Sequence, residues 1–172
     1  ETEILPQFIK MARRHSTQVL IAIGGWGNSS AFSTLASDKD KRRIFSQSCL
    51  ELLQETGAQG IDIDWEFPGI SELGGQPEDG FHLILLLREL RETLGDSYTL
   101  TIDVPGIPQW FGSFNMLEIE KWVDFSSIMS YDMASPELAS TSSVWHNSAL
   151  YDDNKKNHWS WNRLIEHFAE LN

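Results

Sequence analysis

Apolar residues along the chain alternate between the short period of strands and the longer period of helices. Four short runs are apolar throughout or at every second position, which predicts buried strands at residues 18–26, 59–67, 98–106 and 125–131. Elsewhere apolar residues recur at helical spacing, which predicts helices at residues 3–15, 38–56, 81–94, 115–122 and 157–171. In the first helix Ile4, Phe8 and Met11 share one side, and Ser37 is expected to cap the second helix.

The order of these elements predicts the fold class. No turn signal typical of a β-hairpin joins consecutive strands, and a helical segment separates each strand from the next. Parallel strands need such crossovers, so the pattern predicts βαβ units and a parallel α/β sheet. Gly24 and Gly25 end the first strand and indicate close backbone packing there. Residues 136–156 show neither period, and we expect them to form an extended loop over a functional face.

Composition narrows the possible partners. The 172 residues are 41% hydrophobic and can bury one core, so the length predicts one domain. The net charge of −12 argues against nucleic acid and anionic membranes as partners, because basic patches bind both. No apolar run is long enough to cross a bilayer. Cys49 is the only cysteine, so the chain has no internal disulfide and no cysteine metal cluster.

The second predicted strand carries an acid at every second position. Asp62, Asp64 and Glu66 alternate with apolar residues and therefore share one face of the strand. Both faces of a parallel sheet are normally covered, so three carboxylates in a row are costly unless they are hydrogen-bonded or partly protonated. Such a cost is typical of a functional site.

Three interpretations of this acidic strand compete. The apolar neighbours argue against a strand end exposed to water. Carboxylates suit Mg²⁺ or Ca²⁺, but no nearby His, Asn or second acidic cluster completes a metal site. Crowded carboxylates repel, so one of them stays protonated near neutral pH and can donate a proton to a leaving group. The pattern therefore favours acid–base chemistry with neither a metal nor a cofactor.

Four segments resemble one enzyme family. The stretch "GIDIDWEFP" is similar to the D-G-x-D-x-D-x-E signature of family 18 glycoside hydrolases, the chitinases, and "IAIGGW", "IMSYDM" and "HNSALYDD" resemble further family segments in the same order. The resemblance implies a (β/α)8 TIM-type barrel, of which residues 1–172 supply about four central βα units of a partial catalytic domain. We expect the missing strands in the same parent chain, and the 172 residues alone to be inactive.

The sequence departs from the family pattern at three positions. Gln59 stands where the first Asp of the signature belongs, and Ala22 replaces a Ser. Neither residue belongs to the acidic core, so we expect changes in supporting hydrogen bonds only. Asp103 lies where the family usually has a small residue, and its role is open.

The resemblance also implies roles for individual residues. Glu66 would protonate the glycosidic oxygen, and the substrate's own 2-acetamido group would attack the anomeric carbon, so that configuration is retained. Asp64 would orient the acetamido N–H, and Asp62 would share a proton with it. Tyr131 would hold the acetamido oxygen, although by itself it is equally a core aromatic residue. Asp132 would contact the sugar in the same subsite.

Further residues are candidates for substrate contact. Met129 faces inward with Tyr131 and is expected to pack under the site. Aromatic rings in strand-to-helix loops can stack on sugars, although core packing is the common role of any one Trp; these rings belong to Trp26, Trp110 and Trp145. Trp122 and Trp161 lie in helical pattern and are expected to pack.

The implied function is endo-acting hydrolysis of chitin, a polymer of β-1,4-linked N-acetylglucosamine, outside the cell. Two alternatives remain open from the sequence. One is a chitinase-like lectin, or the binding subunit of a larger assembly, that holds chito-oligosaccharides without cleaving them, and the other is an endo-N-acetylglucosaminidase that acts on glycoproteins. Lectin-type relatives commonly lose the acid, whereas Glu66 is present here.

Overall fold

The computed structural model describes residues 4–106, 110–134, 144–153 and 158–170. They belong to two compact units. The first unit comprises Glu1–Asp103 and Ser113–Ser127, and the second comprises Val104–Gly112 and Ile128–Asn172. Within the described residues, no helix is both long and apolar enough to span a membrane.

Four strands form one sheet in the order in which they occur along the chain. They are β1 (Leu20–Gly24), β2 (Gly60–Asp64), β3 (Thr99–Pro105) and β4 (Phe125–Met129). β1 pairs with β2, and β2 pairs with β3, in parallel. The predicted parallel α/β sheet is therefore confirmed, although each strand is shorter than its apolar run.

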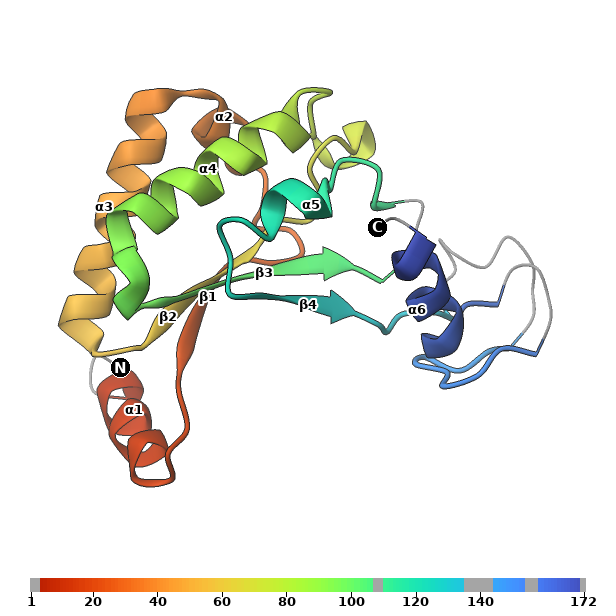
Figure 1. Cartoon of the computed structure of the whole chain (residues 1–172), viewed down its shortest axis with the longest axis horizontal. Helices are drawn as coiled ribbons and strands as arrows, with labels where there is room; N and C mark the ends of the chain where they lie inside the picture. The colour runs from red at the N-terminus through yellow and green to blue at the C-terminus, as the bar shows by residue number, and fades with distance from the viewer. Residues whose placement is uncertain (1–3, 107–109, 135–143, 154–157, 171–172) are drawn as a thin grey trace. The chain divides into compact units, whose positions relative to one another are not determined.

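Helices connect the strands. Their bounds are α1 (Ile4–Arg14), α2 (Phe32–Ser37), α3 (Lys39–Thr56), α4 (Asp79–Leu94), α5 (Met116–Ile119) and α6 (Trp161–Glu170), with short 3-10 turns at Ser71–Leu73 and Gly95–Ser97. Within the first unit, α2, α3 and α4 pack against one another and lie on one side of β1 and β2 (Figure 1).

The sheet has one apolar and one polar face in the first unit. Side chains facing the helices are fully buried in β2 and β3, and they pair in register; they are Ile61 with Leu100 and Ile63 with Ile102. Helix α4 contributes buried leucines to the same core, namely Leu83, Leu86, Leu87, Leu90 and Leu94. Because side chains alternate along a strand, Asp62 and its register partner Thr101 lie on the opposite face. The acids therefore point away from the helix layer.

The helix caps differ from the prediction at one position. Ser37 ends the short helix α2, and Asp38 is the extended residue (φ −103°, ψ 125°) that caps α3. The Asp38 carboxylate accepts hydrogen bonds from the backbone N–H groups of Asp40 (2.9 Å) and Lys41 (3.0 Å). The predicted cap at Ser37 is wrong because the sequence pattern did not reveal α2, which places Ser37 inside a helix.

The two terminal helices, α1 and α6, also differ from the prediction. In α1, Ile9 is buried, whereas Ile4, Phe8 and Met11 are exposed. Helix α6 begins at Trp161 and not at residue 157, which lies outside the described residues. The Trp161 N–H donates to the Ala149 carbonyl at 2.8 Å, so the loop, and not a preceding helical turn, satisfies the start of α6.

The second unit has a small core of its own. Met133, Ala149 and Leu164 are buried, and three aromatic side chains pack against them, those of Trp145, Trp159 and Phe168. The Trp145 indole N–H donates to the Trp159 carbonyl at 2.7 Å, and the ring stacks on His158 with centroids 4.1 Å apart. The described parts of residues 136–156 contain no helix or strand, in agreement with the predicted loop.

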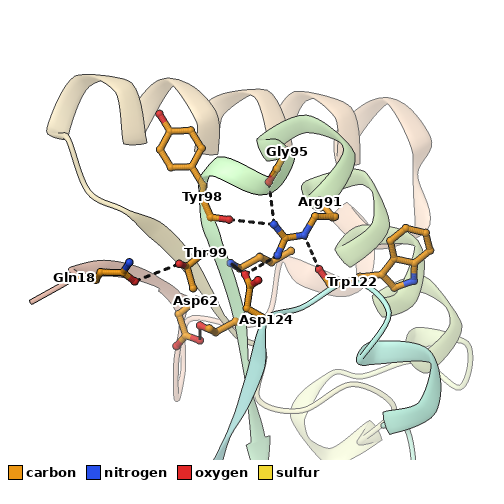
Figure 2. A network of polar contacts seen from close by, with 10 residues as sticks. Gln18, Asp62, Arg91, Gly95, Tyr98, Thr99, Trp122 and Asp124 are labelled. Carbon is orange, nitrogen blue, oxygen red and sulfur yellow. Dashed lines mark hydrogen bonds and ion pairs between the residues drawn. The ribbon is translucent and has the colours of Figure 1, made fainter.

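Arg91 joins the end of α4 to the starts of β3 and β4 (Figure 2). Its guanidinium donates to the backbone carbonyls of Gly95 (2.9 Å), Tyr98 (3.1 Å) and Trp122 (2.9 Å) and to the Asp124 carboxylate (2.7 Å). Although burial alone would raise the pKa of Asp124, hydrogen bonds from the Leu100 N–H and from Arg91, with the Arg91 charge, hold that pKa below its usual value. One side chain thus fixes where two strands begin.

Replacing Arg91 by Met should lower the free energy of unfolding by about 2–3 kcal/mol, because three carbonyls and a carboxylate lose a charged donor. Urea unfolding at pH 7 measures the loss. The control is Arg88→Met, since Arg88 is half exposed and its ion pair with Glu92 is long, at 3.9 Å. This variant should change the free energy of unfolding by less than about 0.5 kcal/mol. Because the pKa of Asp124 is lower in the folded protein than in the unfolded chain, the ionised carboxylate stabilises the fold above the unfolded pKa, and this stabilisation is lost as the pH falls. The loss of stability caused by Arg91→Met should therefore be smaller in acid. Equal free energies of unfolding for the Arg91 and Arg88 variants at pH 7 would show that Arg91 does not hold the starts of the two strands.

Candidate active site

Two neighbouring strands carry the polar face on which the candidate acids lie. Asp62 and Asp64 project from β2, and Asp62 is in register with Thr101 of β3. Asp103 is two residues beyond Thr101, so it shares the same face. The sheet itself therefore assembles a cluster of three aspartates in the first unit.

Hydrogen bonds connect this cluster across the sheet. The Thr101 hydroxyl donates to Asp62 Oδ1, and Figure 2 shows the Asp62 carboxylate turned toward β3. The Asp103 carboxyl group hydrogen-bonds to Asp62 on one side and to Ser127 of β4 on the other. Three adjacent strands thus share one polar row.

Burial and crowding raise the pKa values of two of the aspartates. Burial, followed by the negative charge of Asp62, raises the pKa of Asp64. Burial also raises the pKa of Asp103 to about 7, helped by its hydrogen bond to Asp62 and by the charges of Asp62 and Asp64, while the bond from Ser127 opposes the rise. The Oδ1 atom of Asp64 is buried with no hydrogen-bond partner among the described residues.

Glu66 lies two residues beyond the end of β2, after a buried Trp65. The prediction that it belongs to the strand is therefore wrong, and a loop contact positions it. The Glu66 N–H donates to the Ser29 hydroxyl at 3.0 Å, and that hydroxyl lies 3.1 Å from the carbonyls of both Asp64 and Gly25. The Glu66–Phe67 peptide bond is cis.

The glycines at the end of β1 allow this loop to lie against β2. Gly24 has φ +119°, and a side chain there would collide with the Asp64 carbonyl. The Gly25 N–H donates to that same carbonyl at 2.8 Å. The close backbone packing predicted for these glycines is confirmed.

Glu66 borders a cavity of about 210 Å³, whose lining also includes Trp26, Gly27, Ser29, Ser30 and Leu73. Trp26 is 64% exposed, so its ring is available to a ligand. Of the three tryptophans predicted to contact substrate, Trp26 is the one that the first unit places beside Glu66.

The other predicted site residues lie in the second unit. Met129 ends β4 and is half-buried, while Tyr131 and Asp132 follow the strand and are exposed. The predicted strand to Tyr131 is too long, because Asp132 adopts a left-handed conformation (φ 58°) and its N–H donates to the side chain of Asn147 at 3.2 Å. Trp110 is half-buried, and Trp145 packs as described above. Their convergence with the acids of β2 stays a prediction.

Sequence reasoning missed Ser29, Thr101 and Ser127. The alternation of "TLTID" could have placed Thr101 beside the acids once β3 was paired with β2, but no local pattern indicated Ser29. Of the two departures from the signature, Gln59 does serve a supporting bond, since its side-chain oxygen accepts the Val19 N–H at 2.8 Å. Ala22 lies opposite Asp62 in the register of β1 with β2.

Parallel βα units with acids at and beyond the carboxyl end of a strand are the arrangement of (β/α)8-barrel enzymes. The family model "Glycosyl hydrolases family 18" matches residues 3–172. The chain belongs to this family.

Curated relatives and solved structures agree with this assignment. Chitinase A1 of Niallia circulans is 33% identical over 125 residues, 67% of this chain and 18% of that protein. Chitinase B of Serratia marcescens is 29% identical over 187 residues, 91% of this chain and 36% of that protein. The chitinase domain of the spore coat protein CotE from Clostridium difficile superposes with a TM-score of 0.87 at 28% identity, over 99% of this chain and 50% of that chain. The chain thus spans from 18% to 50% of the length of these proteins.

Replacing Ser29 by Ala should lower the free energy of unfolding by about 1–3 kcal/mol, because the part-buried Glu66 N–H loses its acceptor. Ser29 is only 6% exposed, so water cannot readily replace the hydroxyl. Ser30→Ala is the control, since Ser30 lines the same cavity and is exposed. Urea unfolding compares the two variants, and equal stability would show that Ser29 does not hold the Glu66 backbone.

Proposed function

We propose that the protein hydrolyses chitin, the polymer of β-1,4-linked N-acetylglucosamine, outside the cell and with Glu66 as general acid. The observation that carries the proposal is the position of Glu66, which borders a cavity with the exposed Trp26 and directly follows the aspartates of β2. The matched relatives named above are chitinases. Residues 1–172 would form part of the catalytic domain.

The proposed reaction uses the substrate's own acetamido group. Glu66 donates its proton to the glycosidic oxygen as the bond to the anomeric carbon breaks. The acetamido carbonyl oxygen attacks that carbon and forms an oxazolinium ion, which water then opens with net retention, returning a proton to Glu66. Retention follows because two displacements occur at one carbon.

Asp64 is suited to hold the acetamido N–H. Its Oδ1 atom is buried and has no partner among the described residues, so a substrate N–H would supply the missing hydrogen bond. A donor at this position, and the positive charge that develops on the oxazolinium, would both favour the ionised carboxylate. Asp62, fixed by Thr101, supports Asp64 from the neighbouring position on β2.

Tyr131, Asp132 and Met129 are the remaining residues that we propose for binding the sugar. In this proposal the Tyr131 hydroxyl holds the acetamido oxygen, Asp132 contacts the same sugar, and Met129 packs beneath it. The exposure of Tyr131 and Asp132 agrees with contact to a ligand. Trp26 would stack on a sugar ring, whereas Trp145 already stacks on His158.

A second candidate is hydrolysis of other N-acetylglucosamine linkages, including those of glycoproteins. One similar structure is a family 18 N-acetylglucosaminidase from Paenibacillus barengoltzii, with a TM-score of 0.84 at 28% identity over 97% of this chain and 51% of that chain. Both candidates use the same acid and the same acetamido group. A binding protein without activity is disfavoured because Glu66 is retained.

Replacing Glu66 by Gln in the full-length protein should lower kcat for chito-oligosaccharides by about 10²–10⁴-fold or more, because the amide has no labile proton to donate. Binding should persist, since Gln is nearly isosteric with Glu. A fluorogenic chito-oligosaccharide assay measures turnover, and calorimetric titration with an uncut oligosaccharide measures binding. Glu72→Gln is the control, because Glu72 is an exposed acid in the 3-10 turn Ser71–Leu73. Near-normal turnover by the Glu66 variant would remove it from the acid role.

Replacing Asp64 by Asn should also slow cleavage, because the oxazolinium ion loses its compensating charge. The loss should appear in kcat more than in KM, since the charge develops in the transition state. Initial rates in the same assay over a range of substrate concentrations separate kcat from KM. An unchanged kcat would contradict the role of Asp64.

A further inference from the structure

Asp103 of β3 is an acid that the proposed reaction does not use. It lies on the polar face of the sheet, two residues beyond Thr101 and on the strand next to Asp62 and Asp64. Its carboxyl group is half-buried between Asp62 and Ser127 and hydrogen-bonds to both. The hydrogen bond between Asp103 and Asp62 determines which carboxyl group of the site carries a proton.

A hydrogen bond between two carboxyl groups requires one proton, because an ionised carboxylate only accepts. The Asp62 carboxylate already accepts a hydrogen bond from the Thr101 hydroxyl. The contact is therefore satisfied when Asp103 carries the proton and donates it to Asp62, while Asp103 accepts from Ser127. Both donors to Asp62 then come from β3.

The surroundings of Asp103 favour the neutral form. In the part of the chain that the structure describes, the groups that act on its carboxyl are Asp62 and Asp64 from β2 and Ser127 from β4, and none of these three is a cation. Burial, the hydrogen bond to Asp62 and the two negative charges together raise the pKa of Asp103 to about 7. A carboxyl group in this position is thus protonated below neutral pH and releases its proton to water above it.

We propose that Asp103 is a positioning residue. Below neutral pH its carboxyl group is protonated and donates a hydrogen bond to Asp62, so the acid cluster carries one negative charge fewer than when Asp103 is ionised. When Asp103 ionises, the hydrogen bond is lost and three carboxylates face one another. The consequence for catalysis rests on the proposed function, whereas the protonation of Asp103 does not.

The first test uses stability and does not depend on activity. A raised folded-state pKa means that the folded protein keeps a proton which the unfolded chain releases near its ordinary value of 3.8, so this group's stabilising effect falls as the pH rises from about 4 to about 7 and is constant above. Asp103→Asn keeps a donor toward Asp62 and cannot ionise. The Tm of the Asn variant of the full-length protein, relative to the parent, should therefore rise between pH 5 and pH 7 and level off by pH 8.

Asp96→Asn is the matched control, because Asp96 is an exposed acid in a 3-10 turn. Its Tm difference from the parent should be the same at every pH from 5 to 8. If the Asp103 and Asp96 variants both give profiles parallel to the parent, Asp103 holds no proton in the folded state and the proposal is wrong.

The second test follows kcat/KM against pH with a chito-oligosaccharide. The parent should show a limb near pH 7 that is absent from Asp103→Asn, and Asp103→Ala, which lacks any donor, should have a lower kcat/KM at pH 6 than Asp103→Asn. If the Asn and Ala variants are equal at pH 6, Asp103 does not position Asp62. If the full-length protein cleaves no chito-oligosaccharide, the proposed function fails while the Tm profiles still decide whether Asp103 holds the proton.

Discussion

The site depends on one constraint, the two-residue alternation of side chains in a strand whose other face is buried. Ile61 and Ile63 are held without exposure against the helix layer, so the register of β2 cannot slip. Asp62 and Asp64 are thereby fixed on the opposite face, beside the polar residues of β3. The apolar core therefore determines where the acids point.

The cost of crowding carboxylates is offset by hydrogen bonds from neighbouring strands. Thr101 donates to Asp62, and Asp103 and Ser127 extend the row across β3 and β4. The remaining imbalance appears as raised pKa values for Asp64 and Asp103, each caused first by burial. Carboxyl groups whose pKa values are raised by burial and by neighbouring charges are typical of functional sites.

The loop after β1 serves a different purpose from the sheet. Gly24 and Gly25 allow the backbone to approach Asp64, and the Ser29 hydroxyl then binds the backbone on both sides of Trp65. Glu66 therefore leaves β2 with a fixed backbone, next to the exposed ring of Trp26. The proposed acid is held by contacts between residues more than thirty positions apart in the chain.

The sequence by itself determined the four strands, most of the helices, their parallel order and the face that Asp62 and Asp64 occupy. These features follow from local periods of two and 3.6 residues, which any stretch of the chain carries within itself. Only the tertiary structure decided that Asp38 and not Ser37 caps α3, that α6 begins at Trp161, and that Glu66 lies beyond the strand. It also brought Ser29 to the backbone of Glu66, and Thr101, Asp103 and Ser127 into one row with Asp62. Each of these depends on which carbonyl, hydroxyl or carboxyl group an adjacent segment brings within hydrogen-bonding distance, and residue spacing along one strand cannot encode that.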